Sequence, residues 1–179
     1  RISSKNSRIL GGKPLIVWTI EVALQVVAAE NIFISTDDPS LLSHTDILGL
    51  PNFGLRPARL ARDESPTIEV VEYCIDKMEQ SGQVVDSVLL LQPTTPFRSL
   101  KTLSKAILLH EQTGDKVVSL SKNRTPPAWS FSLDDGFISQ LHEDGMLAAR
   151  SQLHRASYSL NGSFFIATRK DLLTSKSFI

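Results

Sequence analysis

The sequence has little that would tie it to an oxidising compartment, a membrane or a nucleic acid. It holds one cysteine, Cys74, so a disulfide framework is excluded and a reducing compartment is expected. Lysine plus arginine and aspartate plus glutamate each total 19, so no net field draws the chain toward nucleic acid or anionic lipid. No apolar run approaches the ~20 residues of a bilayer span, and no signal peptide is visible, although the chain starts on Arg1. We therefore expect a cytoplasmic protein.

Several common catalytic signatures are missing as well. No G-x-S-x-G nucleophile elbow occurs, and the opening string RISSKNSRILGGKP is not a Walker loop. The histidines lack metal-ligand spacing, and we interpret all four as surface residues: His44, His110, His142 and His154. The candidate site must therefore be sought in other polar segments.

The 179 residues, 41% hydrophobic and 21% charged, suit one well-filled soluble domain. Short apolar runs alternate with longer segments of helical period. The expected strands are 31–36, 87–92, 116–121 and 163–169; the expected helices run from Pro14 to about Glu30, over 39–48, from Thr67 to about Gln80, and from Leu100 to about Gln112. Near-continuous apolar strands separated by helices predict a parallel α/β sheet covered on both faces.

From Asn123 this alternation stops. The stretch 125–141 predicts a hairpin around an Asp-Asp-Gly turn, and 142–160 is polar and irregular. We expect one α/β domain with an insertion at about 123–160. Such an insertion suits a subunit contact or a lid, and a plain surface meander is the alternative.

Polar side chains follow three of the predicted strands where each one ends. They lie at 35–38 (STDD), 92–98 (QPTTPFR) and 119–124 (SLSKNR). Ligands of open parallel α/β sheets bind outside the carboxyl ends of the strands, so we expect the three sets to share one edge. Helix capping explains a serine or threonine in the second set, but not Gln92 and Arg98. We interpret this loop as part of a ligand site; the alternative is a strand end that caps the following helix.

The loop 55–67 is a second cluster, with Arg56, Arg59, Arg62 and Asp63 before a helix N-terminus. Arginines and helix N-termini suit anionic or polar-edged ligands, although such a loop taken alone is often only solvated. The basic and small polar residues before the Gly-Gly turn at the N-terminus could cradle a phosphate.

Read together, these segments resemble the CMP-sialic acid synthetase family, which comprises cytidylyltransferases for N-acylneuraminate and related acid sugars. The resemblance is carried by KNSRILGGKPLIVWTIEVAL, ISTDD, RPARLARDESPT, LLLQPTTPFRS, RSQ at 150–152 and Y-x-x-NGSFFI at 158–166, in the family's order. It implies a Rossmann-like nucleotidyltransferase fold and the transfer of CMP from CTP to a nine-carbon acid sugar. It also implies Mg²⁺ as cofactor, a homodimer, and a dimerisation role for the insertion.

The resemblance assigns roles to matching positions of this sequence. Lys5 and Asn6 are expected against the ribose and phosphates, while Arg56 and Thr67 are expected at the cytosine edge. Lys5 and Gln92 are the expected catalytic residues. The residues expected to bind the sugar are Gln92, Arg150, Gln152, Tyr158, Asn161 and Phe178. Phe178 resembles a residue that one subunit contributes to the sugar site of its partner. The alternative for Phe178 is a core or interface role.

The sequence also departs from the family pattern. It starts after the position of the family's first strand and Ala-Arg-x-x-Ser-Lys phosphate loop, and it stops before the Asp-x-Asp metal motif, so the metal ligands are unknown. Leu153 replaces the family's aspartate, and His154-Arg155 replaces a Leu-Pro. These departures leave the choice of sugar open. The alternatives are a same-fold enzyme for Kdo, pseudaminic or legionaminic acid, or a non-catalytic nucleotide-binding module.

Overall fold

Apolar residues on alternate sides of two strands set the layers of the fold. The computed structural model describes residues 4–141, 150 and 154–179. In it, β3 (Ser87–Leu90) pairs antiparallel with β7 (Tyr158–Thr168), with Val88 opposite Ala167 and Leu90 opposite Phe165. Successive side chains of a strand point to opposite faces, so each strand contributes to two cores.

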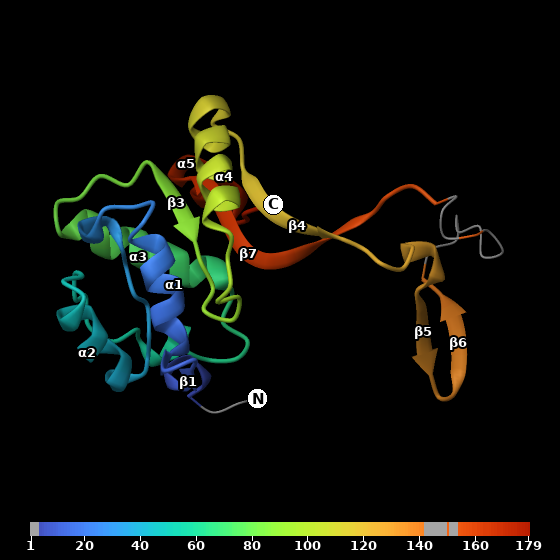
Figure 1. Cartoon of the computed structure of the whole chain (residues 1–179), viewed down its shortest axis with the longest axis horizontal. Helices are drawn as coiled ribbons and strands as arrows, with labels where there is room; N and C mark the ends of the chain where they lie inside the picture. Colours follow the sequence, from blue (N-terminus) through green and yellow to red (C-terminus); the bar gives the residue numbers. More distant parts are fainter. Residues whose placement is uncertain (1–3, 142–149, 151–153) are drawn as a thin grey trace. The chain divides into compact units, whose positions relative to one another are not determined.

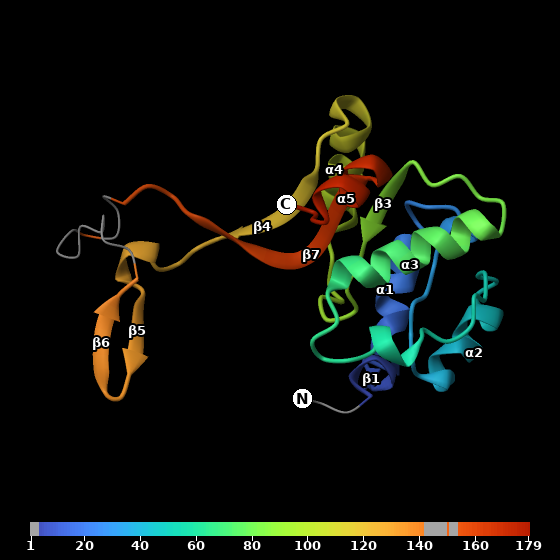
Figure 2. The same cartoon turned by 180° about the vertical axis from the view of Figure 1, so that it is seen from behind.

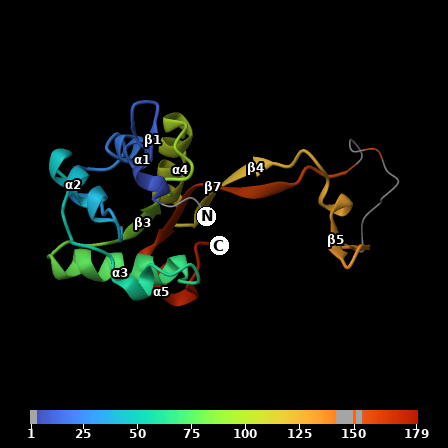
Figure 3. The same ribbon diagram turned by 90° about the horizontal axis from the view of Figure 1, so that it is seen from below.

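Helices cover both of these faces (Figure 3). On one face, Val88, Leu90 and Ala167 pack with residues of α3 (Thr67–Gln80) and α5 (Arg169–Ser175). On the other, Leu89 and Ile166 pack with α4 (Leu100–Thr113) and with the end of α1 (Leu15–Ala23). The view from behind shows α3 and α5 together on their face (Figure 2). The prediction that helices cover both faces of the sheet is confirmed.

The chain divides into two compact units, Arg1–Val118 with Gly162–Ile179, and Ser119–Asn161. The first unit also contains α2 (Pro39–Ile47) and the short pair β1 (Ile9–Leu10) and β2 (Lys13–Pro14). The second contains the hairpin of β5 (Phe131–Asp134) and β6 (Phe137–Gln140), seen in Figure 1. Its turn has Asp135 and Gly136 at φ 49° and 85°, the conformation of a two-residue hairpin turn, as predicted.

The helix boundaries follow from their caps. Asp38 accepts from the Ser40 N–H at 2.9 Å and starts α2, and Ser99 caps α4, which ends at Gly114 with φ 73°. The predictions for α2, α3 and α4 are confirmed within two residues. The first helix is shorter than predicted, because after Ala23 the chain makes bonds of the tighter i to i+3 kind, such as Val26 N–H to Ala23 C=O at 3.0 Å.

The strands differ from the prediction in two respects. The β3–β7 pair is antiparallel, because β7 returns from the second unit between β3 and β4 (Val117–Lys122). The segment 31–36 is not a ladder strand in the described part of the chain. Its Ile34 is buried against α1 and α2, so the hydrophobic pattern was interpreted correctly, but a ladder also needs a partner strand. Among the described helices none is long and apolar enough to cross a membrane.

Candidate active site

The polar end of segment 31–36 meets the loop 55–67 at Arg56. The Arg56 N–H donates to the Thr36 carbonyl at 2.7 Å, and Arg56 Nη2 donates to Asp37 Oδ1 at 2.7 Å. The Nε atom of Arg56 is buried and has no hydrogen-bond partner in the described part of the chain. Asp37 thus orients the guanidinium while one buried donor is left for a ligand.

Ser35 and Cys74 lie near Arg56 and Asp37, and we call these four residues the Arg56 cluster. The Ser35 hydroxyl is buried, and among the described residues its one hydrogen-bonding neighbour is the Cys74 thiol of α3. Burial raises the pKa of Cys74 to about 11, and the Ser35 hydroxyl and the Arg56 charge oppose that rise only in part. The thiol is therefore protonated at neutral pH. Sequence analysis gave Cys74 no place in the site, because only the tertiary structure brings α3 to Arg56.

The N-terminal segment reaches the Asp37-Asp38 pair through Ser7. Lys5 and Asn6 are half-buried in a short 3₁₀ turn (Lys5–Ser7), which packs beside α1. Asn6 Oδ1 is a further buried atom with no partner among the described residues. The pKa of Asp38 is lowered chiefly by hydrogen bonds from the Ser40 side chain and backbone, and also by the Ser7 hydroxyl. Ser7 therefore connects the N-terminal segment to the Asp37-Asp38 pair.

Thr67, the second residue predicted at the base edge, is exposed at the first position of α3. Its hydroxyl does not cap the helix, which begins after Pro66 without a side-chain cap. Thr67 and Cys74 are seven residues apart, so they share a face of α3. The predicted role of Thr67 at the base edge stays a prediction.

The loop 92–98 is held by its own polar groups. Arg98, predicted to face a ligand, is turned inward, and that interpretation was wrong. Its Nε donates to the Ser163 carbonyl at 2.6 Å, its Nη1 to Thr19 Oγ1 at 2.8 Å, and its Nη2 to the Gln92 carbonyl. Burial lowers the pKa of Arg98 to about 10, so it stays charged at neutral pH.

The Gln92 side chain is half-buried, and no hydrogen bond within the described residues fixes its amide. It lies beside Gly162, where an added Cβ would stand 3.6 Å from Gln92 Oε1 and 3.8 Å from Thr95 Oγ1. Gly162 has φ 70°, which a side chain would strain, and its carbonyl accepts from Thr95 at 3.3 Å. No described residue occupies the Gln92 amide, and its contact with a ligand stays a prediction.

The remaining predicted sugar residues lie largely in the second unit. Asn161 accepts from Ser119 at 2.6 Å and donates to Ser121 at 3.0 Å, so its amide ties β7 to β4. Tyr158 is 57% exposed at the start of β7, and Arg150 is exposed. Gln152, like the family departure at Leu153, lies outside the described residues.

Phe178 is only 8% exposed and packs in the core of its own chain, with its ring centroid 5.9 Å from that of Phe165. This arrangement matches the core alternative that the sequence left open. To contribute to the sugar site of a partner subunit, Phe178 would have to leave this core with the C-terminal segment. Its role in such a site stays a prediction.

The histidines are less exposed than predicted. His110 is 6% exposed, with Nδ1 2.6 Å from the Asp115 carbonyl and Nε2 2.8 Å from Ser87 Oγ, so it joins the end of α4 to β3. His44 is half-buried, and so is His154, whose ring lies edge-on to Trp129. His142 lies outside the described residues. Within those residues no three histidine, cysteine, aspartate or glutamate side chains gather as metal ligands.

Comparisons with known proteins identify the family of the chain. The cytidylyltransferase family profile matches residues 1–130. The chain is 39% identical to the CMP-N,N'-diacetyllegionaminic acid synthase of Legionella pneumophila, over 99% of this chain and 77% of that protein. It is 32% identical to the N-acylneuraminate cytidylyltransferase of Escherichia coli, again over 99% of this chain but only 41% of that longer protein.

The fold is also found among solved structures. A CMP:2-keto-3-deoxy-manno-octonic acid synthetase complexed with CTP superposes with a TM-score of 0.69, over 98% of this chain and 72% of that one. The identity is 15%, so this likeness concerns the fold alone, and it confirms the predicted nucleotidyltransferase architecture. With the family profile and two relatives above 30% identity, the chain belongs to the cytidylyltransferase family.

Proposed function

We propose that this protein transfers CMP from CTP to the anomeric hydroxyl of a nine-carbon acid sugar of the sialic or legionaminic type, with release of pyrophosphate. The observation that carries the proposal is that buried polar atoms of Asn6 and Arg56 have no partner among the described residues. Each such atom costs about 1–3 kcal/mol when left unpaired. A ligand that pairs with them recovers this cost, so these atoms are suited to bind a polar ring.

Cytosine has the complementary groups. It offers a carbonyl oxygen as acceptor and an exocyclic amine as donor. Arg56 supplies a buried donor at Nε, and Asn6 supplies a buried acceptor at Oδ1. The Thr67 hydroxyl can serve either group. Lys5, adjacent to Asn6, would supply a positive charge to the phosphates of the nucleotide.

The reaction requires positioning more than covalent chemistry. The anomeric oxygen forms a bond to the α-phosphorus while the bond from that phosphorus to the bridging oxygen breaks, and pyrophosphate leaves with the electron pair. The hydroxyl proton passes to water or a base. Gln92 would hold the acceptor hydroxyl in line, because its amide is free while its backbone is fixed by Arg98. Lys5 would balance the charge that develops on the phosphate oxygens.

We propose Mg²⁺ as the cofactor from the chemistry of the CTP triphosphate alone. No ready metal site exists among the described residues, since Asp37 is paired with Arg56 and Asp38 caps α2. Mg²⁺ is commonly held by substrate phosphates with one or two carboxylates, so a triphosphate would bring most of its ligands. Removal of divalent cations with EDTA should abolish transfer, and activity that survives in EDTA would contradict this.

The comparison of relatives bears on the choice of acid sugar. The identity to the N,N'-diacetyllegionaminic acid enzyme is higher than to the N-acylneuraminate enzyme, which supports a legionaminic-type acceptor. The replacement of the family's Leu-Pro by His154-Arg155 leaves the choice of sugar open.

The test measures pyrophosphate release by the purified protein with CTP, UTP, GTP and ATP, each combined with N,N'-diacetyllegionaminic acid, N-acetylneuraminic acid or Kdo. We expect turnover with CTP and a nine-carbon sugar. Turnover with Kdo or with another nucleotide would favour the alternative enzymes. Binding of CTP without turnover on any acid sugar would favour a nucleotide-binding module.

The hairpin of the second unit supports a homodimer. Leu133, Phe137 and Ile138 are 70%, 80% and 69% exposed, and such apolar surface commonly marks an interaction site. Phe137→Ser should shift the protein from dimer to monomer in light scattering at micromolar concentration. An unmodified protein that is already monomeric under these conditions would contradict this assembly.

A further inference from the structure

Three elements of the first unit meet at one guanidinium. Arg98 reaches α1 through Thr19 Oγ1, β7 through the Ser163 carbonyl, and the end of the β3 segment through the Gln92 carbonyl. All three guanidinium nitrogens donate to the protein. The side chain is half-buried and belongs to the loop that it fixes.

The loop needs this side chain because its backbone supplies few bonds. Pro93 and Pro96 have no N–H group to donate. The backbone bonds inside the loop are Thr95 N–H to the Gln92 carbonyl and Arg98 N–H to the Pro96 carbonyl, each 3.2 Å. That length is at the long end of the ordinary range for N–H···O hydrogen bonds. Arg98 therefore replaces main-chain hydrogen bonds that a proline-rich loop lacks.

We propose that Arg98 is a positioning residue for the acceptor sugar, which holds the Gln92 carbonyl and thereby fixes the direction of the Gln92 amide without touching the sugar itself. This inference rests on the proposed function, since it takes Gln92 to meet the acceptor. The second clamp, from Thr95 Oγ1 to the Gly162 carbonyl at 3.3 Å, is longer and uncharged, so it cannot hold the loop equally well.

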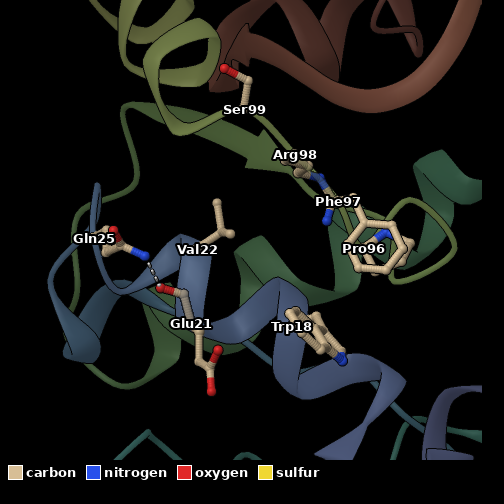
Figure 4. Close-up of a pocket in the computed structure, with 8 residues that line it drawn as sticks. All are labelled: Trp18, Glu21, Val22, Gln25, Pro96, Phe97, Arg98 and Ser99. Carbon is tan, nitrogen blue, oxygen red and sulfur yellow. Dashed lines mark hydrogen bonds between the residues drawn. The ribbon is translucent and has the colours of Figure 1, made fainter. Parts of the chain in front are cut away.

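The surroundings of Arg98 allow a direct test. An open hollow of about 550 Å³ lies between α1 and the residues that follow Pro96, and Arg98 lines it (Figure 4). The other residues around it are Trp18, Glu21, Val22, Gln25, Pro96, Phe97 and Ser99. Truncation to Arg98→Ala would leave a space beside solvent that a free guanidinium ion can enter.

The first experiment needs no substrate. Hydrogen exchange of the amides in 92–98 is compared for Arg98→Ala and for a matched control, Arg169→Ala. Arg169 is also bound through its guanidinium, to Glu79 at 2.6 and 3.0 Å, but it contacts α3 and not the loop. We expect exchange in the loop to rise about tenfold for Arg98→Ala only. Equal exchange in both variants would overturn the inference.

The second experiment is kinetic. Arg98→Ala should lower kcat with the acid sugar about 100-fold, because a small misplacement spoils in-line attack, while CTP affinity stays within about twofold. Arg98→Lys keeps the charge but replaces three donor nitrogens in a planar fork by a single one, and should lose nearly as much. Arg169→Ala should lower the melting temperature and leave kcat unchanged.

Guanidinium ion, well below concentrations that unfold proteins, should restore part of the Arg98→Ala activity, whereas equal urea should not. A purely structural role predicts the reverse pattern: lost stability, unchanged kinetics and no rescue. If the unmodified protein makes no CMP-sugar at all, the proposed function fails and the acceptor role falls with it, while hydrogen exchange still decides whether Arg98 clamps the loop.

Discussion

The cluster around Arg56 and the loop 92–98 use their polar groups in opposite ways. Around Arg56 and in the N-terminal segment, buried atoms of Arg56 and Asn6 have no partner among the described residues. The loop, by contrast, binds its own arginine on all three nitrogens, while the Gln92 amide has no partner among the described residues. Both segments look similar in the sequence, since each combines arginine, proline and hydroxyl side chains.

The difference indicates two ways of preparing a ligand site. In the first, the protein leaves polar atoms unpaired, so that the ligand completes the hydrogen bonding. In the second, the protein completes its own hydrogen bonds and presents one side chain on a rigid support. The first arrangement suits recognition of a base, and the second suits placement of a reacting hydroxyl. Substitutions in the two regions should therefore affect different steps.

The largest effect is expected at Gln92. Gln92→Ala should lower kcat/KM for the acid sugar about 100-fold and leave the melting temperature and CTP affinity nearly unchanged, because the amide faces the ligand and one misplaced hydroxyl spoils attack. Gln25→Ala is the matched control, since the Gln25 amide donates to the Glu21 carbonyl of the preceding helix α1 at 3.0 Å. A Gln92 variant that loses stability but keeps turnover would make Gln92 a structural residue.

A chemical probe measures how buried the Arg56 cluster is. The pKa of Cys74 is raised from 9.0 to about 11, so at pH 8 the thiolate population is about 100-fold smaller than that of an unshifted thiol. Labelling with a disulfide reagent should be correspondingly slow in the native protein and fast after unfolding. The raised pKa also means that stability falls as pH rises from about 9 to about 11, and Cys74→Ala should lack that component. Fast native labelling at pH 8 would show that the cluster is open to water.

Arg56→Ala should weaken CTP binding by about 1–3 kcal/mol, the range for losing a charged hydrogen bond. Calorimetry on Arg56→Ala and on Arg59→Ala, an exposed arginine of the same loop, separates this contact from the general charge of the loop. Equal losses in the two variants would show that the loop acts only through its net charge.

A smaller effect is expected for the ion pair between Arg56 and Asp37. Asp37→Asn should weaken CTP binding by up to about tenfold, because the neutral amide orients the guanidinium less strongly. Asp38→Asn is the comparison, as Asp38 caps α2 and should alter stability by about 1 kcal/mol or less without changing CTP affinity. If both variants bind CTP normally, Arg56 is held by the Thr36 carbonyl and its packing, and not by Asp37.

Much of the first unit was predictable because local signals agreed with one another. The period of Ile68, Val71 and Ile75 predicted α3, and Ser99 marked the start of α4. The strand prediction for 31–36 was correct in burial and wrong in pairing, since burial depends on the pattern of one segment and pairing on two. His110 was misjudged as exposed for a related reason: its partners, Ser87 and the Asp115 carbonyl, belong to other parts of the fold.

The sequence by itself determined the family, the helical periods, the Asp135-Gly136 turn, and Gln92 and Arg56 as candidate site residues. Only the tertiary structure decided that Arg98 points inward, that Cys74 lies against Arg56, and that Asn6 carries a buried, unpaired oxygen. The physical reason is that residue type and local spacing fix what a side chain can donate or accept. Which atoms it meets depends on elements distant in the sequence, since Arg98 and Thr19 are 79 residues apart.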